Sequence, residues 1–242
     1  MELNGCRILL TGGAIRVGAF VAKKLAEAGA ILTIHANRSL SEAETLIAEF
    51  CGSGHKIIKC NYLNGSIEEV SRQILTDCGD FDGLINNASV FGASSLLADT
   101  PENRFRNWRV NYEIPLALMA GFAKEKLEGK KSGWVVNFLD QAVLQSGRRG
   151  GSYLHSKQAL YEATLEAARE WAPLVRVNAI APGPVLAPPG LEHLKMEKTL
   201  QSVPLGRPVA LEDIAAAVIF LIRNESITGT VLPVDCGQHL GK

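Results

Sequence analysis

Short apolar runs alternate with helical patterns along nearly the whole chain, and this alternation restricts the fold more than any other feature. Repeated β-α units predict a parallel sheet with helices on both faces. Several runs are apolar at successive positions, as expected for strands that are buried on both faces. We therefore expect a doubly wound α/β domain that binds its ligands at the carboxyl ends of the strands. The predicted strands are Cys6–Leu10, Ile31–His35, Lys56–Cys60, Gly83–Asn86, Trp134–Leu139, Val175–Ile180 and Val231–Val234.

Helices are predicted between these runs. Ser41 is followed three residues later by Glu44, which is a capping-box pattern, so one helix is expected to begin there. No linker, repeat or low-complexity segment interrupts the alternation, and we interpret residues 1–242 as one domain. The predicted helices are Val17–Ala28, Ser41–Phe50, Ser66–Asp77, a helix in pieces from Thr100 to Leu127, Tyr153–Trp171 and Leu211–Ile222.

The composition excludes several classes of function. The 242 residues include 25 basic and 25 acidic ones, and this balance gives no support to binding of nucleic acid or membrane surfaces. The five cysteines form no C-x-x-C pair, which argues against a disulfide framework or a zinc site, and we expect no metal. No apolar run approaches the ~20 residues of a membrane span, and no signal-peptide pattern is present. We expect a soluble, cytoplasmic protein.

One proline-rich region breaks the rhythm of strands and helices. Pro182–Pro208 holds six of the chain's ten prolines and a short helical pattern near Leu191–Leu200. The region is either a long surface connection or a flap over a ligand. Long ordered loops in compact domains are often functional, and Pro182-Gly183 follows a predicted strand end. We therefore favour a substrate flap over about residues 184–208.

The stretch Thr11–Gly18 joins the first predicted strand to the first predicted helix. A strand, a glycine-rich turn and a helix in this order let backbone amides approach a phosphate at the helix N-terminus. The spacing is T-G-x-x-x-R-x-G rather than the common G-x-G-x-x-G, with Arg16 inside it. A nucleotide is the expected ligand of this loop.

The second predicted strand leads into Asn37-Arg38-Ser39. NAD-binding folds often place an acid about 20 residues beyond the glycine loop, where it holds the ribose 2′-hydroxyl. That acid is absent here, whereas the Arg38 guanidinium and the Ser39 hydroxyl suit a 2′-phosphate. Arg38 could instead be a solvated loop charge. With the glycine loop upstream, we predict that the cofactor is NADPH.

Asn86-Asn87-Ala88-Ser89 follow the fourth predicted strand, and Phe91 comes two residues later. Neighbouring asparagines can brace the backbone by local hydrogen bonds, although an ordinary turn can have the same composition. Phe91 is either a core residue or, because it lies just past a strand end, a surface on which a flat ligand stacks.

Tyr153 and Lys157 are four residues apart and share one face of the helix after the fifth predicted strand. A nearby ammonium lowers the pKa of a phenol, which makes proton transfer near neutral pH feasible. Any helix can contain Y-x-x-x-K by chance. Its position after the other motifs favours a catalytic pair.

With these motifs the chain resembles the short-chain dehydrogenase/reductase family along nearly its whole length. The resemblance implies a Rossmann-type seven-stranded sheet in the order 3-2-1-4-5-6-7, hydride transfer with a nicotinamide cofactor, and a dimer or tetramer, of which we expect the homotetramer. It also implies that Tyr153 is the general acid and that Lys157 binds the nicotinamide ribose and tunes Tyr153. Asn111 would hold a water in a proton relay. The matching segments are Thr11–Gly18, Asn86–Ser89, Asn111, Tyr153, Lys157, Pro182-Gly183 and Ile227–Asp235.

Asp140 stands where most members of that family have a serine, 13 residues before the tyrosine. An ionised carboxylate only accepts hydrogen bonds, so it would repel the oxyanion that forms in ketone reduction. The ring nitrogens of a pterin must instead gain protons, and a nearby acid can assist. Asp140 therefore argues against ordinary ketone or alcohol chemistry.

Within the family, the pteridine reductases resemble this chain best. They share the aspartate, the arginine matched by Arg16, a strand end matched by His35 and Arg38-Ser39, and an N-N-A-S-x-F motif. This likeness implies that Phe91 stacks on the pterin. It also implies that Ser89 and Arg16 contact the pterin and the cofactor phosphates.

These inferences define three groups of candidate residues. Asn61-Tyr62 replace the family's usual aspartate near the adenine, but Asn61 can still accept one hydrogen bond. The expected catalytic residues are Asn111, Asp140, Tyr153 and Lys157. The expected cofactor-binding residues are Gly12, Arg16, Val17, Asn37, Arg38, Ser39, Asn61, Tyr62, Asn87, Ala88, Ser89, Tyr153, Lys157, Pro182 and Gly183. The expected substrate-binding residues are Arg16, Ser89, Phe91, Asp140 and Tyr153.

Three functional hypotheses follow. The leading one is an NADPH-dependent reductase that transfers a hydride to a pteridine of the dihydropterin or dihydrofolate class. The second is a carbonyl reductase, for example a 3-oxoacyl-thioester reductase. The third, from a different class, is a non-catalytic NADP-binding sensor. Retention of Asn111, Asp140, Tyr153 and Lys157 argues against the sensor, because a degenerate binder has no chemical reason to keep all four.

Overall fold

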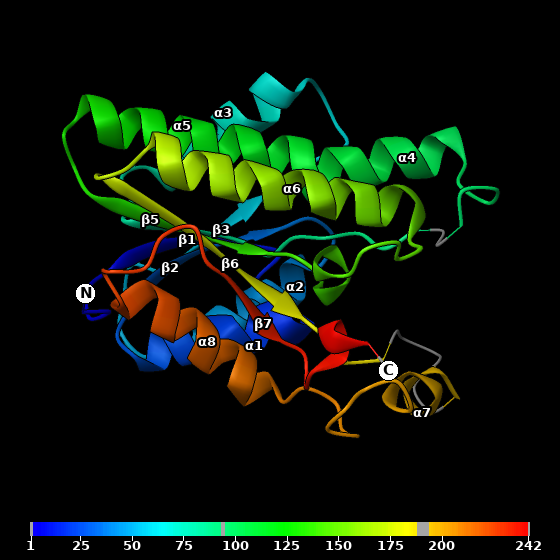
Figure 1. Cartoon of the computed structure of the whole chain (residues 1–242). Helices are drawn as coiled ribbons and strands as arrows, with labels where there is room; N and C mark the ends of the chain where they lie inside the picture. The colour runs from blue at the N-terminus through cyan, green and yellow to red at the C-terminus, as the bar shows by residue number, and fades with distance from the viewer. Residues whose placement is uncertain (1, 93–94, 188–193, 242) are drawn as a thin grey trace.

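The computed structural model describes residues 2–92, 95–187 and 194–241. Seven strands form one parallel sheet in the order β3-β2-β1-β4-β5-β6-β7, and helices cover both of its faces (Figure 1). The expected architecture and strand order are confirmed. The strands are β1 Arg7–Thr11, β2 Ile31–Ala36, β3 Lys56–Lys59, β4 Gly83–Asn86, β5 Gly133–Phe138, β6 Val175–Pro182 and β7 Val231–Val234.

Helices form a layer on each face of the sheet. One layer contains α1 and α8, and the other contains α3, α5 and α6 (Figure 1). Each layer buries its own apolar cluster against the sheet. The helices are α1 Arg16–Glu27, α2 Leu40–Ala48, α3 Ile67–Cys78, α4 Pro101–Trp108, α5 Ile114–Glu128, α6 Gly151–Glu170, α7 Leu194–Leu200 and α8 Leu211–Arg223, with a π-helix η1 at Arg109–Glu113 and 3-10 turns η2 Gln141–Leu144 and η3 Gln238–Leu240.

The capping box expected at Ser41 and Glu44 is wrong. Helix α2 begins at Leu40, and the Ser39 side chain at its N-cap makes no capping bond. A capping box instead begins α3. There the Glu69 amide donates to Ser66 Oγ at 3.1 Å, and the Ser66 amide donates to Glu69 Oε2 at 2.7 Å. Both patterns precede a helix, so sequence spacing alone does not separate the box that forms from the one that does not.

The proline-rich segment after β6 lies beside the carboxyl ends of the strands, with α7 near the C-terminus (Figure 1). Its expected helical pattern corresponds to α7, and residues 191–193 of that expectation lie outside the described residues. Within the described ranges, no helix is long and apolar enough to cross a bilayer. All five cysteines are free thiols.

Gly83 allows β4 to pack against the largest side chain of the core. A Cβ at this position would lie 2.1 Å from two carbons of the Trp134 ring, and Trp134 on neighbouring β5 is only 1% exposed. Since the ring is closed in by the α1 and α8 layer, it has no room to move aside.

Gly83→Ala should therefore lower the free energy of unfolding by at least ~2 kcal/mol, because overpacking a closed core costs about this much. Denaturant unfolding measures the change. In a Trp134→Leu background the same substitution should cost less, since the clashing ring is gone. Equal costs in both backgrounds would contradict the proposed clash.

Candidate active site

The glycine loop places free backbone donors at the start of α1. Ile15 occupies the N-cap of α1, and no side chain caps the helix, so the first-turn amides remain available for an anion. Gly12 has φ +62°, and a Cβ there would lie 2.8 Å from the Ala88 Cα. A Cβ at Gly18 would lie 2.3 Å from the Gly12 carbonyl oxygen. Glycine at both positions lets the loop fold closely over the helix end.

Thr11 and Asn87 join this loop to the end of β4. Asn87 Nδ2 donates to the carbonyl oxygens of Thr11 and Gly12, at 2.9 and 2.8 Å. Thr11 Oγ1 accepts hydrogen bonds from the amides of Asn87 and Ala88, at 3.0 and 3.1 Å. The structure thus brings Asn87 and Ala88 to the glycine loop, and the side chain of Asn87 braces backbone there.

His35 fastens the same loop to β3. The Gly12 amide lies 3.4 Å from His35 Nδ1, and His35 Nε2 lies 2.9 Å from the Cys60 carbonyl oxygen. Nδ1 can accept from the amide only when unprotonated, so we assign the proton to Nε2. Burial lowers the pKa of His35 to about 4, which keeps the ring neutral. The imidazole ring also stacks on the ring of Tyr62, with 4.5 Å between the ring centres. His35 is thus a structural brace.

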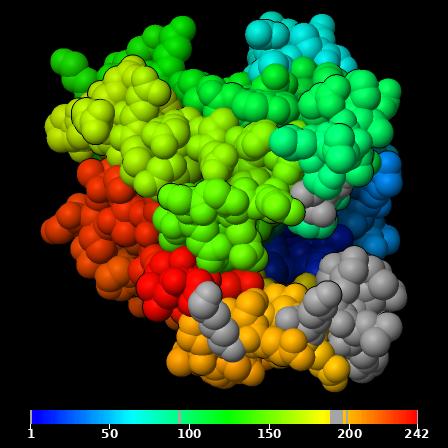
Figure 2. Space-filling model, turned by 45° about the vertical axis from the view of Figure 1, so that its right-hand side comes forward, coloured from blue at the N-terminus to red at the C-terminus, as the bar shows by residue number. Residues whose placement is uncertain are grey.

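A cavity of about 530 Å³ extends from the glycine loop across the ends of β1, β2 and β4. Figure 2 looks onto this end of the molecule, where the dark-blue N-terminal segment lies at the bottom of a hollow between green segments and the orange residues around α7. Eleven of the fifteen expected cofactor-binding residues line the cavity. They are Gly12, Arg16, Val17, Asn37, Arg38, Ser39, Asn61, Tyr62, Asn87, Ala88 and Ser89.

Arg38 and Ser39 lie at the outer end of this cavity. Arg38 is exposed, and its guanidinium forms no ion pair or hydrogen bond with any residue in the described ranges. An unpaired guanidinium beside a serine hydroxyl at a cavity wall is well suited to a phosphate group. The geometry therefore agrees with the role that the sequence predicts for Arg38.

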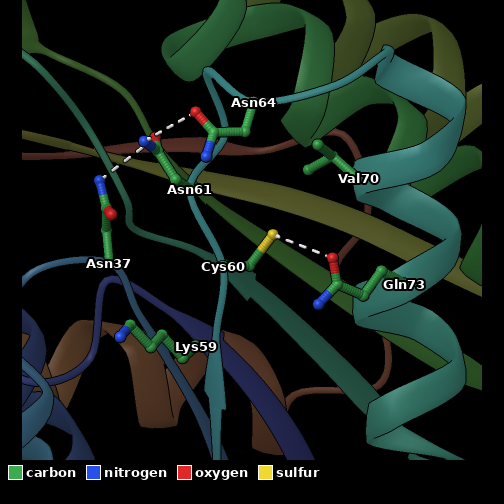
Figure 3. Close-up of a pocket in the computed structure, with 7 residues that line it drawn as sticks. All are labelled: Asn37, Lys59, Cys60, Asn61, Asn64, Val70 and Gln73. Atoms are coloured by element: carbon green, nitrogen blue, oxygen red, sulfur yellow. Dashed lines mark hydrogen bonds between the residues drawn. The ribbon is translucent and has the colours of Figure 1, made fainter.

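Asparagines surround the expected adenine position. Figure 3 shows Asn37, Asn61 and Asn64 in a hydrogen-bonded chain beside a smaller hollow of about 290 Å³. Asn37 Nδ2 donates to Asn61 Oδ1 at 3.4 Å, and Asn61 Nδ2 donates to Asn64 Oδ1 at 3.2 Å. Asn61 Oδ1 also accepts from the Leu63 amide at 3.1 Å. Since this oxygen already has two donors, an adenine amino group would have to displace the weaker one, from Asn37.

Tyr153 and Asp140 are in direct contact. Tyr153 Oη donates to Asp140 Oδ2 at 2.8 Å, and Asp140 Oδ1 accepts from the Ala142 amide at 2.9 Å. Burial raises the pKa of Tyr153 well above its usual value of 10, and the negative charge of Asp140 raises it further. The structure thus gives Tyr153 a raised pKa in place of the lowered one expected from Lys157, because burial and the adjacent carboxylate set its surroundings.

Lys157 lies at the base of the site and is buried. Its Nζ donates to the carbonyl oxygen of Phe138 at 2.7 Å, at the end of β5. Burial lowers the pKa of Lys157 from 10.5 to about 8, although the charge of Asp140 acts in the opposite direction. Lys157 thus holds its proton at neutral pH, but less firmly than a lysine in water.

Asn111 comes from the π-helix η1, which interrupts the run from α4 to α5. Its Oδ1 accepts from the Val90 amide at 2.9 Å and from Ser89 Oγ at 3.0 Å. Its Nδ2 donates to the Val90 carbonyl oxygen at 3.0 Å and to Ser156 Oγ at 3.2 Å. The side chain is fully buried and both of its ends are engaged. It fixes the Ser89–Val90 loop to α6, and the water-relay role stays a prediction.

A second cavity, of about 320 Å³, opens beside Tyr153 and Asp140. Phe91, Pro182 and Gly183 line it, as expected for residues near a bound substrate and nicotinamide. Phe91 is 73% exposed, which excludes the core interpretation, and its ring centre lies 4.7 Å from that of Tyr153 in an edge contact.

Five further polar residues that the sequence analysis missed line this second cavity, namely Gln141, Arg148, Arg149, Thr199 and Gln238. Gln141 is buried, and its Oε1 atom accepts no hydrogen bond from any residue in the described parts of the chain. Arg148 and Arg149 are exposed, and Gln238 comes from η3 near the C-terminus. The available signal was position: Gln141 directly follows Asp140, and the two arginines lie just before Tyr153. No spacing rule connects Gln238 to these residues.

Arg16 connects the glycine loop to the flap. It adopts φ +55°, a left-handed conformation that costs a non-glycine residue about 1–2 kcal/mol. Its Nη2 donates to the carbonyl oxygens of Leu186 and Ala187, at 3.2 and 3.0 Å. The same residue lines the larger cavity. The strained backbone therefore aims the guanidinium at the first residues of the flap, and the predicted contact with substrate stays a prediction.

The known proteins that this chain resembles belong to one family but have different activities. The family model described as enoyl-(acyl carrier protein) reductase matches residues 13–239. L-xylulose reductase from Cavia porcellus is 29% identical over 244 residues, which cover 98% of each chain. The 3-oxoacyl-[acyl-carrier-protein] reductase FabG of Vibrio harveyi is 30% identical, over 99% of this chain and 100% of that protein.

One solved structure shares the overall fold at higher identity. It is the crystal structure of FolM alternative dihydrofolate reductase 1 from Brucella canis, complexed with NADP. The two chains are 35% identical with a TM-score of 0.86, and the match covers 99% of this chain and 96% of that one.

Asp140→Asn should lower the pKa of Tyr153, because a neutral amide no longer opposes the phenolate and can donate a hydrogen bond to it. Tyrosinate absorbance measured against pH tests this. Tyr153→Phe in each background isolates the signal from the other three of the four tyrosines. Wild-type Tyr153 should stay protonated until alkaline unfolding. An unchanged pKa in the variant would show that Asp140 does not control this phenol.

Proposed function

Because the chain belongs to the short-chain dehydrogenase/reductase family, we propose that it is an NADPH-dependent reductase that transfers a hydride to a pteridine of the dihydropterin or dihydrofolate class. The observation that most supports this proposal is the 2.8 Å hydrogen bond from Tyr153 Oη to Asp140 Oδ2. A carboxylate beside the proton donor suits a substrate nitrogen that gains a proton, and it opposes an oxygen that gains negative charge.

The residues of the larger cavity fit a phosphorylated dinucleotide. The uncapped start of α1 offers amides to a pyrophosphate. The close approach of Gly12 to Ala88 leaves a backbone cradle that a Cβ would fill. Arg38 and Ser39 would hold a 2′-phosphate, and Asn61 would face the adenine. Bound NADPH would supply the hydride. The likeness to an NADP-complexed FolM structure supports this choice of cofactor.

The smaller cavity fits a flat heterocycle. Phe91 offers an exposed ring at its wall, and Leu154, Pro182 and Pro184 add apolar surface. Gln141 Oε1, which has no partner among the described residues, can accept a hydrogen bond from an N–H group of the heterocycle. Polar atoms at the edge of a pterin would meet such partners, while its faces would pack on the apolar groups.

Tyr153 is the proposed proton donor. Its high pKa keeps Oη protonated, and the hydrogen bond to Asp140 Oδ2 holds that proton between two residues that line the cavity. As the substrate nitrogen becomes basic, the proton at Oη moves to it, and the positive charge of Lys157 offsets the phenolate that remains. The Phe138 carbonyl holds the ammonium of Lys157 in place at 2.7 Å.

A carbonyl reductase is the second candidate. The likeness to FabG of Vibrio harveyi, at 30% identity over 99% of this chain, favours it. In that case Asp140 would have to be protonated during the reaction, so that it donates to the carbonyl oxygen rather than repelling it.

The substrate is tested by measuring NADPH oxidation with dihydrofolate, 7,8-dihydrobiopterin, an acetoacetyl thioester and L-xylulose. We expect turnover of at least one of the two pteridines. Tyr153→Phe should lower that kcat about 10²- to 10⁴-fold, the usual effect of losing a general acid. Tyr161→Phe, on the same helix, is the matched control and should leave kcat unchanged. Reduction of the thioester without reduction of either pteridine would reject the proposal.

Cofactor choice is tested by Arg38→Ala. The variant should raise the KM for NADPH about 10- to 100-fold, because a hydrogen bond to a charged group typically contributes about 1.5–3 kcal/mol. The KM for NADH should stay nearly the same, since NADH lacks the 2′-phosphate. Arg72→Ala on α3 controls for loss of a surface charge. An equal effect on both cofactors would contradict the 2′-phosphate contact.

A further inference from the structure

Arg148 and Arg149 form a pair of cations at the rim of the smaller cavity. They lie on the segment between η2 and α6, and both side chains are exposed. They line the same cavity as Asp140 and Tyr153. Arg149 is four residues before Tyr153, so at most about 15 Å of chain separates it from the proposed proton donor.

Within the described residues, no carboxylate pairs with either of these arginines. Of the described residues that line the cavity, only Asp140 is acidic, and its two oxygens are engaged by Tyr153 and by the Ala142 amide. Two adjacent unpaired arginines repel each other, and a carboxylate that binds between them relieves this repulsion.

The cavity thus has two chemically different ends. Its inner wall contains the buried Gln141, with an unpartnered amide oxygen, and the apolar Leu154. Its rim carries two positive charges. A ligand that matches both ends has a flat polar ring at one end and a negatively charged group at the other.

We propose that Arg148 and Arg149 bind the carboxylates of an anionic tail on the substrate, so that the enzyme favours a pteridine with an aminobenzoyl-glutamate tail over one with a neutral side chain. This inference rests on the proposed function and specifies its substrate class. The ring occupies the inner end beside Tyr153, and the glutamate carboxylates reach the two guanidinium groups.

The test is the steady-state kinetics of the Arg148→Gln/Arg149→Gln double variant with dihydrofolate and with 7,8-dihydrobiopterin. The KM for dihydrofolate should rise about 5- to 30-fold, as expected for charge-assisted contacts partly screened by solvent. The kcat should stay unchanged, and the KM for dihydrobiopterin should change less than twofold. Arg148→Lys/Arg149→Lys should recover part of the loss. Arg169→Gln, an exposed residue of α6, is the matched charge control.

Two further measurements separate the possible explanations. Free p-aminobenzoyl-glutamate should inhibit the wild type competitively against dihydrofolate, and the double glutamine variant should be insensitive to it. Added salt should raise the KM for dihydrofolate in the wild type and much less in the variant, because screening weakens exposed charge contacts.

The outcomes distinguish this inference from the proposed function. Equal losses for both pteridines would show that the arginines support the loop rather than the tail. No change for either would show that they bind nothing in the reaction. Both results would overturn the tail contact while pteridine reduction itself stood. If the wild type reduced only thioesters, and the double variant lost activity with a thioester on acyl carrier protein but not with a free thioester, the pair would be a protein-docking surface and both proposals would fail.

Discussion

The hydrogen bonds between Thr11 and Asn87 are the constraint on which the rest of the site depends. Beyond the ends of β1 and β4 the sheet supplies no further partners, so side chains must satisfy the loop backbone. Asn87 Nδ2 covers two carbonyl groups, and Thr11 Oγ1 covers two amides. Loops that are 76 residues apart in the chain thereby become one unit, at the point between β1 and β4 where a doubly wound sheet reverses its strand order.

A chain of buried polar side chains extends this rigidity to α6, the helix that contains Tyr153. Asn86 Nδ2 donates to Asn137 Oδ1, and Asn137 Nδ2 donates to Thr164 Oγ1, both at 2.9 Å. These bonds join β4, β5 and α6 across a completely buried asparagine. Buried polar networks favour one arrangement, because every alternative leaves a polar group without a partner. The glycine loop and the helix that contains Tyr153 are therefore held in one fixed arrangement.

Features that depend on local apolar patterns were predicted from the sequence, and features that depend on contacts between distant segments were not. Each strand lies within two residues of its expected range. For the inner strands β2, β1, β4, β5 and β6 the reason is that burial on both faces requires apolar residues along the strand. The strand order came from family resemblance, since apolar runs do not encode their neighbours. The π-helix at Arg109–Glu113 has no periodic signature. The pKa of Tyr153 depends on its contact with Asp140, at the N-cap of η2, and sequence spacing does not describe this contact. The position of Arg148 and Arg149 at the smaller cavity follows from the three-dimensional path of the segment between η2 and α6, which the sequence does not specify.

The charges around Tyr153 select a kind of reaction rather than one substrate. Tyr153 Oη contacts the carboxylate of Asp140. Lys157 is buried one helical turn further along α6, and its pKa of about 8 keeps it cationic at neutral pH. A ketone that accepts a hydride becomes an anion, and the carboxylate opposes it. An imine nitrogen that takes a proton before or during hydride transfer becomes a cation, and the same carboxylate stabilises it. Asp140 in the position of a serine therefore reverses the sign of the charge that the site favours, and this reversal is the physical reason for which we propose a nitrogen heterocycle as the substrate.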